Sequence, residues 1–64
     1  MKRLIKKSEQ LFDVGNVVLF KTHPYDNITP YTIKEVLEDN RYFIENDDNA
    51  YTGIDGKNLE LLQQ

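Results

Sequence analysis

The side chains that could do chemistry are few in this 64-residue chain, and their spacing does not assemble a catalytic group. There is no cysteine, and the only histidine, His23, stands beside Pro24 in a stretch rich in turn-forming residues. Nucleophilic catalysis needs a nucleophile, a base within hydrogen-bond reach and a third group that orients the base. Ser8 and His23 do not offer such a set. We therefore predict that the protein is not an enzyme.

Metal and cofactor sites are not predicted either. Residues 46–49 read Asn-Asp-Asp-Asn, an oxygen-rich stretch of the kind that binds calcium. A calcium loop beginning at Asp48 would have Gly53 at its sixth position, as required, but Ala50 at the third and Leu59 at the twelfth, where oxygen ligands are needed. The glycines are scattered instead of gathered in a phosphate-binding loop. We expect residues 46–49 to form a solvated turn, and no metal or cofactor to be bound.

The net charge of −3 conceals two regions of opposite sign. Residues 1–12 carry four cations against one carboxylate, a balance of +3, and residues 13–64 carry four cations against ten carboxylates, a balance of −6. The N-terminal cations are Lys2, Arg3, Lys6 and Lys7. They could contact a few phosphates of a nucleic acid, weakly and with a steep salt dependence, because the acidic body repels the backbone. An ordinary solubilising terminus is the alternative.

Much of the negative charge lies on one predicted hairpin, where Arg41 is the only cation between Glu35 and Asp48. Its outward-facing carboxylates are expected to be Glu35, Glu38, Asp39, Glu45, Asp47 and Asp48. Charged residues along strand edges protect a sheet from aggregation, which explains part of this pattern. The alternative is an electrostatic dock for a basic partner protein, including one whose nucleic-acid site an acidic mimic would block.

The elements that must position these residues are predicted to be short strands. Apolar or β-branched runs occur at 17–20, 31–37, 42–44, 50–52 and 59–62, and turn-forming residues separate them. The longest connection is a loop over 22–30 that contains two prolines. Ile33 and Val36 break strict alternation, which predicts a β-bulge near residues 34–35. This pattern indicates an all-β fold, a small five-stranded antiparallel barrel.

Residues 1–11 are expected to form a basic N-terminal arm, and residues 12–64 the barrel domain. The arm could add a short helical turn from Ser8 or an extra edge strand around Leu4 and Ile5. No apolar stretch approaches the roughly 20 residues of a membrane span, and no secretory signal follows the N-terminal cations. We therefore expect a soluble cytoplasmic protein. So small a core also permits a homodimer that pairs through an exposed edge strand.

Hydrophobic patterns along the chain carry a resemblance to a known family. They are, in order, Phe12-x-Val14-Gly15-x-Val17-Val18, Tyr31-x-Ile33-x-x-Val36, Arg41-Tyr42-x-Ile44 and Leu59-x-Leu61. Together they resemble the Src-homology-3-like small barrel in its broad sense, which includes bacterial and phage members and the Tudor- and KOW-type domains. The resemblance covers roughly residues 12–62 and implies a binding module. The chain lacks the Ala-Leu-Tyr-Asp-Tyr segment and the tryptophan with which signalling members hold proline-rich peptides.

In such barrels the ligand surface lies on the loop after the first strand, which implies a rim formed by His23, Tyr25 and Tyr31. The leading interpretation is therefore a non-enzymatic module that docks onto a partner protein with a basic surface, through residues 22–31 and the acidic hairpin. The full set of expected partner-binding residues is His23, Tyr25, Tyr31, Glu35, Glu38, Asp39, Tyr42, Asp47 and Asp48.

A composition rich in Lys, Asn, Ile and Asp indicates an AT-rich bacterial or phage genome, so we expect a phage, mobile-element or bacterial accessory protein. The alternative function is a nucleic-acid-associated barrel that uses the N-terminal cations, with exposed Tyr25 or Tyr42 stacking on bases.

Overall fold

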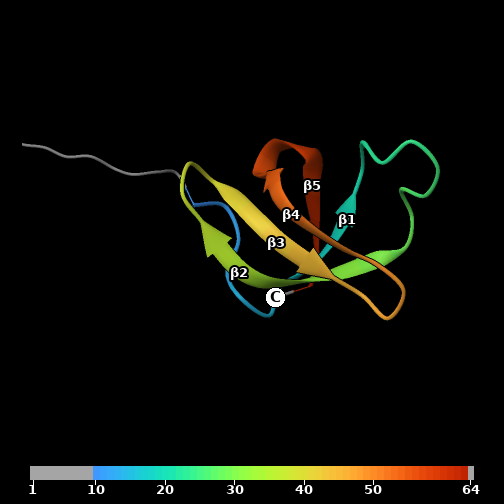
Figure 1. Cartoon of the computed structure of the whole chain (residues 1–64), viewed down its shortest axis with the longest axis horizontal. Coiled ribbons are helices and arrows are strands. Elements are labelled where there is room, and N and C mark those ends of the chain that lie inside the picture. Colours follow the sequence, from blue (N-terminus) through green and yellow to red (C-terminus); the bar gives the residue numbers. More distant parts are fainter. Residues whose placement is uncertain (1–9, 64) are drawn as a thin grey trace, which may run out of the picture.

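The computed structural model describes residues 10–63 and folds them into one antiparallel sheet of five strands. The strands are β1 (Val17–Phe20), β2 (Pro30–Leu37), β3 (Arg41–Glu45), β4 (Ala50–Asp55) and β5 (Leu59–Gln63), with a 3₁₀ turn, η1 (Gly56–Asn58), before β5. Their order in the sheet is β4-β3-β2-β1-β5 (Figure 1). The prediction of an all-β chain with five antiparallel strands is confirmed.

Irregularities in strand pairing bend the sheet. The pairing of β2 with β3 shifts between Ile33 and Glu35, where the sequence predicts a bulge. The shift lets Ile33 face the core while Val36 pairs with Tyr42 and is partly buried. Similar shifts occur between β1 and β5 and between β3 and β4. Since a bulge increases the local twist and bend of its strand, these shifts curve the sheet around its core (Figure 1).

The core is small and contains two tyrosines among its largest side chains. Its buried members are Phe12, Val18, Tyr31, Ile33, Tyr42, Ile44 and Leu59, with Phe20, Val36, Tyr51 and Ile54 packed against them. A buried tyrosine contributes a large apolar ring, but its hydroxyl needs a hydrogen-bond partner. The core therefore needs hydrogen-bond partners for its tyrosine hydroxyls as well as apolar contacts.

Successive hairpins place the connections at two opposite ends of the sheet (Figure 1). One end, here called the loop end, holds the loop 21–29 and the turn 46–49. The Asn46 side chain of the turn donates a hydrogen bond to the carbonyl of Pro30, the residue after the loop, at 3.4 Å. The other, here called the closed end, holds residues 10–13 and the turn 38–40. The 3₁₀ turn η1 begins at the closed end, where the Gly56 N–H donates to the Asn40 carbonyl, and ends beside the loop, where the Asn58 carbonyl accepts from the Lys21 N–H. The two ends are built differently.

At the closed end, the Tyr42 hydroxyl ties three segments together. It accepts from the backbone N–H groups of Leu11 at 2.9 Å and Phe12 at 3.2 Å, and it donates to the Asn40 side chain. The Phe12 ring meets the Tyr42 ring edge-on, with centroids 5.3 Å apart. Tyr42 is 0% exposed, so the expectation that it lies at the surface is wrong. Its hydroxyl is used inside the protein, and its ring belongs to the core.

The turn of the closed end requires residues that tolerate positive φ. Asp39 and Asn40 have φ values of 62° and 56°, which Asp and Asn adopt more readily than most residues. The Asn40 carbonyl accepts from the Gly56 N–H at 2.8 Å, so the turn also anchors η1. A Cβ at position 56 would lie 2.6 Å from the Asn40 amide nitrogen, which explains why glycine stands there. The polar turn predicted at 38–41 is confirmed.

In the order of the sheet, β4 and β5 are the outer strands. Leu61 and Leu62 of β5 are exposed, and Glu60 is the strand's one charged residue. A strand of this kind is open to pairing with another strand. Dimerisation through an edge strand stays a prediction, which light scattering on the purified chain would decide.

Candidate docking surface

At the loop end, aromatic rings from four separate segments gather into one cluster. We call this the aromatic cluster: Phe20 of β1, His23 and Tyr25 of the loop, Tyr31 of β2 and Tyr51 of β4. The rings of Phe20, His23 and Tyr51 lie against one another, and the His23 ring centroid is 5.4 Å from that of Phe20, 5.7 Å from Tyr51 and 6.0 Å from Tyr25. The rings meet edge to face, the arrangement that aromatic quadrupoles favour. Tyr51 was not among the expected site residues, because 28 positions separate it from His23 in the sequence.

Both ring nitrogens of His23 are engaged. Nδ1 accepts from the backbone N–H groups of Tyr25 at 3.0 Å and Asp26 at 2.9 Å. Because two donors point at Nδ1, the neutral ring carries its proton on Nε2, which then donates to the Tyr51 hydroxyl at 3.1 Å. The side chain therefore folds the first half of its own loop and fastens the loop to β4.

Asp26 folds the second half of the loop in the same way. Its carboxylate accepts from the Thr29 hydroxyl at 2.5 Å and from the backbone N–H groups of Ile28 at 3.3 Å and Thr29 at 3.1 Å. The Thr29 hydroxyl, aided by the two backbone donors, holds the pKa of this carboxyl below its ordinary value, against the opposing effect of partial burial. Two consecutive side-chain caps thus shape a loop that contains no regular secondary structure.

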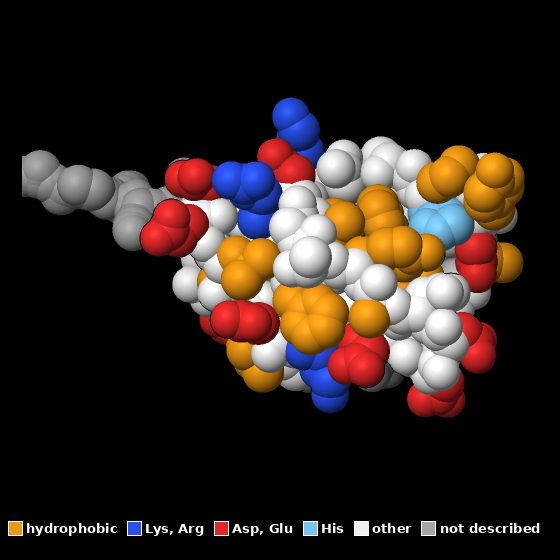
Figure 2. Space-filling model, in the orientation of Figure 1, with side chains coloured by type: hydrophobic (Ala, Val, Ile, Leu, Met, Phe, Trp, Pro, Cys, Tyr) orange, Lys and Arg blue, Asp and Glu red, His pale blue; other side chains and the backbone are white. Residues whose placement is uncertain are grey.

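The folded loop holds apolar side chains out into solvent. Tyr25 is 91% exposed and Ile28 is 78% exposed, and Pro24 between His23 and Tyr25 is exposed as well. Figure 2 shows apolar side chains grouped beside the histidine at this end of the molecule. Exposed apolar groups held in a fixed arrangement are characteristic of interaction sites. We call Pro24, Tyr25 and Ile28 the apolar tip.

Tyr31 lies beneath this surface instead of at its rim. It is 1% exposed and packs near Tyr51, with centroids 5.8 Å apart. Burial raises the pKa of its phenol, because the low-dielectric surroundings disfavour the phenolate. The expectation that Tyr31 forms the rim is therefore wrong. Its ring lies beneath the other rings of the aromatic cluster, whereas Tyr25 is exposed and His23 is partly exposed.

The acidic residues expected on one patch are divided between separate parts of the sheet. Asp47 and Asp48 lie in the turn 46–49 at the loop end, while Glu38 and Asp39 lie in the turn at the closed end. Glu35 and Glu45 lie between the turns, on β2 and β3. Consecutive turns of a meander fall at opposite ends of the sheet, so the two acidic turns do not form one continuous patch. Of these six residues, Asp47 and Asp48 lie at the loop end, which also holds the apolar tip.

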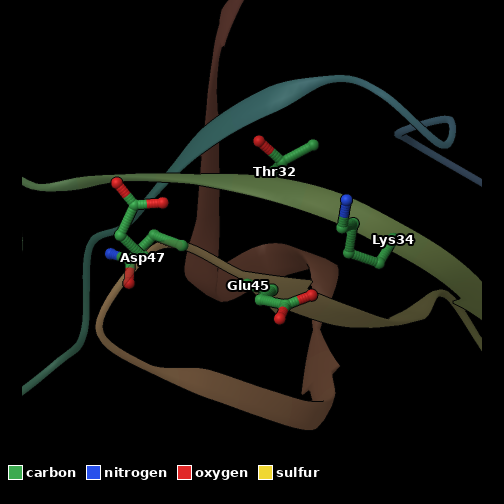
Figure 3. A pocket seen from close by; sticks show the side chains of 5 residues that line it. Thr32, Lys34, Glu45 and Asp47 are labelled. Atoms are coloured by element: carbon green, nitrogen blue, oxygen red, sulfur yellow. The ribbon is translucent and has the colours of Figure 1, made fainter.

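A shallow hollow lies on the face shared by β2 and β3 (Figure 3). It has a volume of about 250 Å³, and its lining is Thr32, Lys34, Glu45, Asn46 and Asp47. Small-molecule sites are larger, roughly 300–1,000 Å³, and mostly apolar. The lining here is polar and carries both signs of charge, which suits water and ions of the solvent better than a defined ligand.

Two kinds of site can be assessed only for residues 10–63. Within that range no three His, Asp or Glu side chains gather closely enough to hold a metal ion. The same part of the chain contains no helix with the length and apolar character needed to cross a membrane. The basic arm cations Lys2, Arg3, Lys6 and Lys7, and the helical turn or extra edge strand expected there, lie outside the described residues.

Comparisons with family models, with curated proteins and with solved structures find no match for this chain.

Proposed function

We propose that this chain is a non-enzymatic binding module, a Src-homology-3-like small barrel of bacterial or phage type that docks onto a partner protein in the cytoplasm. The five-strand antiparallel order, the long loop between β1 and β2, and the 3₁₀ turn before β5 support this type of fold. The docking surface is the loop end, with the apolar tip at its centre.

The observation that carries the proposal is an exposed apolar tip on a backbone held by side-chain caps. Tyr25 and Ile28 have little contact with the core, so their exposure contributes nothing to folding. The backbone beneath them is nevertheless fixed by the bonds to His23 and Asp26. A surface that is ordered before binding loses less conformational entropy on association. Both features favour recognition of another protein.

The charge at this end indicates the kind of partner. Asp47 and Asp48 are exposed in the turn that neighbours the loop, and residues 13–64 carry a net charge of −6. We infer a partner with an apolar contact point bordered by basic residues, since complementary charge speeds association and suppresses wrong partners. A nucleic-acid-binding protein inhibited by an acidic competitor is one such partner.

The experiment compares matched variants at the two ends. Tyr25→Ala and Asp47→Lys should each reduce capture of the partner from a bacterial lysate at least tenfold, while Glu38→Lys, the same charge reversal at the closed end, should leave capture unchanged. Circular dichroism would verify that all variants are folded. Equal loss in Glu38→Lys, or full capture by Tyr25→Ala, would overturn the proposal.

A second measurement tests the alternative function, binding of nucleic acid. The burial of Tyr42 removes one of the two tyrosines expected to stack on bases and leaves Tyr25. Anisotropy titrations with single-stranded DNA at low salt, on the full chain and on a chain without residues 1–7, would detect binding by the arm. Salt-sensitive binding that disappears with the deletion, together with no protein partner, would favour the alternative.

A further inference from the structure

We propose that His23 is a proton-sensitive cap: the neutral ring holds the loop 21–29 in its docking shape, and protonation of the ring releases it. For its biological consequence this inference rests on the proposed docking function. The cap itself is a property of the free chain and can be tested without a partner.

The chain contains related caps that do not use histidine. Asn46 Oδ1 accepts from the backbone N–H groups of Asp48 at 2.9 Å and Asn49 at 2.8 Å, the same second and third positions that His23 Nδ1 serves in its own loop. Asp55 caps η1 by accepting from the Lys57 N–H at 3.1 Å. An amide does not titrate, whereas an imidazole changes its charge between about pH 5 and 8. The histidine cap therefore adds a pH response that the asparagine cap lacks.

Protonation acts directly on the atom that makes the cap. Nδ1 accepts two hydrogen bonds only while its lone pair is free. In the imidazolium both nitrogens are donors, so Nδ1–H would face the N–H groups of Tyr25 and Asp26, donor against donor. The Nε2–H bond to Tyr51 can persist in either form. The ring thus loses its hold on the loop while it keeps its contact with β4.

The groups around the ring determine what replaces the lost bonds. From β1 the ring meets Phe20, and from β4 it meets the hydroxyl of Tyr51; neither carries charge at neutral pH. From β2, Tyr31 lies behind Tyr51 and stays neutral, because burial raises the pKa of its phenol. Within the loop the ring meets Tyr25, and it lies near enough to the Asp26 carboxylate to lower the pKa of that group. Among residues 10–63, Asp26 is the negative charge coupled to the ring.

The Asp26 carboxylate gives the protonated ring a second effect on the loop. This carboxylate attracts an imidazolium, but its oxygens already accept from Ile28, Thr29 and the Thr29 hydroxyl. If the protonated ring turns Nδ1–H toward Asp26, it competes with those donors. The caps under Tyr25 and under Ile28 then weaken together. Protonation therefore disorders the backbone that holds Tyr25 and the backbone that holds Ile28.

The test is an NMR titration of the full chain between pH 8 and pH 5.5. We expect the amide signals of Tyr25 and Asp26 to shift together with the His23 ring signals. Their hydrogen-exchange protection factors should fall about tenfold, which corresponds to the loss of about 1.4 kcal/mol of hydrogen-bond free energy. The amides of Asp48 and Asn49, capped by Asn46, are the internal control and should not follow the ring.

His23→Asn is the matched variant, because asparagine supplies the same acceptor without a titrating ring, as Asn46 does. The variant should keep protection at Tyr25 and Asp26 across the whole pH range. A wild-type loop that stays protected while the ring titrates, or an unchanged transition in His23→Asn, would overturn the inference. The readout uses the free chain, so failure to capture any partner would overturn the docking proposal and leave this result standing.

Discussion

The two ends of the sheet each use a tyrosine hydroxyl, but in opposite ways. At the closed end, Tyr42 is buried and its hydroxyl accepts from two backbone N–H groups and donates to Asn40. At the loop end, Tyr51 is partly buried and its hydroxyl meets the ring of His23, beneath a tip of exposed apolar side chains. The closed end satisfies its polar groups internally and exposes Leu11 at 58%, whereas the loop end exposes Tyr25 at 91% and Ile28 at 78%.

The backbone of each end is held by a different means. The closed end depends on the buried Tyr42 hydroxyl, on the Asn40 side chain and on the fit of Gly56 against Asn40. The loop end depends on caps from His23, Asp26 and Asn46, all on the protein's surface or partly buried. Substitutions at the closed end should therefore change the free energy of unfolding, and substitutions at the loop end should mainly change the surface.

Apart from the truncation of a core ring, the largest expected difference comes from removing the same hydroxyl oxygen at each end. Tyr42→Phe leaves the buried N–H of Phe12 without an acceptor, while the Leu11 N–H keeps Asn40 Oδ1, and should lower the free energy of unfolding by about 2 kcal/mol. Tyr51→Phe removes a partly exposed partner that water can replace, so its cost should stay below about 1 kcal/mol. Urea unfolding followed by circular dichroism measures both. Equal losses of unfolding free energy in the two variants would show that the two ends do not differ in how they use the tyrosine hydroxyl.

Gly56→Ala should have the next largest effect. The added methyl group would displace the Asn40 side chain from its bonds with Leu11 and Tyr42, at a cost of about 1–2 kcal/mol. In an Asn40→Gly background the methyl group finds room, so the same substitution should cost much less. A double-mutant cycle would give this coupling. Additive costs would show that the fit of Gly56 against Asn40 is unimportant.

Much of the fold could be predicted from the sequence, because strand and turn signals are local. The β-branched and aromatic runs, the polar turns and the two-proline loop locate the strands. The broken alternation between Ile33 and Val36 locates the bulge, since side-chain period and register are linked. These properties depend on neighbours in the chain and therefore appear in a single sequence.

The candidate site could be predicted only in part, because it depends on contacts between distant residues. Tyrosine is compatible with both core and surface, and only the partners of Tyr42 and Tyr31 place both rings inside. The hydrogen bond between His23 and Tyr51 crosses from the loop to β4 and has no local signal. The division of the acidic hairpin follows from the meander, in which the turns before and after β3 lie at opposite ends.

The acid response of the loop end should be smaller than the effects above and should depend on Asp26. The pKa of this carboxyl is lower in the folded chain than its ordinary value of 3.8, so the folded state binds the proton less tightly than the unfolded state. Its stabilising contribution is present above pH 3.8 and is lost as the pH falls through the lower, folded value.

Asp26→Asn should therefore lose less stability between pH 6 and pH 3 than the wild-type chain does. Asp48→Asn, which removes an exposed carboxylate from the neighbouring turn, is the matched control and should retain the wild-type acid response. Urea midpoints at the two pH values measure the difference. A wild-type response in Asp26→Asn would mean that the cap formed by this carboxylate does not stabilise the loop.

The smallest expected effect is at the apolar tip. Tyr25 is 91% exposed, and within the aromatic cluster its ring pairs with that of His23. Tyr25→Ala should therefore change the free energy of unfolding by less than about 0.5 kcal/mol. Tyr31→Ala is the contrasting variant: it empties a fully buried site in the same cluster and should cost at least about 3 kcal/mol. Thermal unfolding of both variants tests the pair. A loss above 1 kcal/mol in Tyr25→Ala would show that this ring supports the fold, and its exposure would then no longer be evidence for a docking surface.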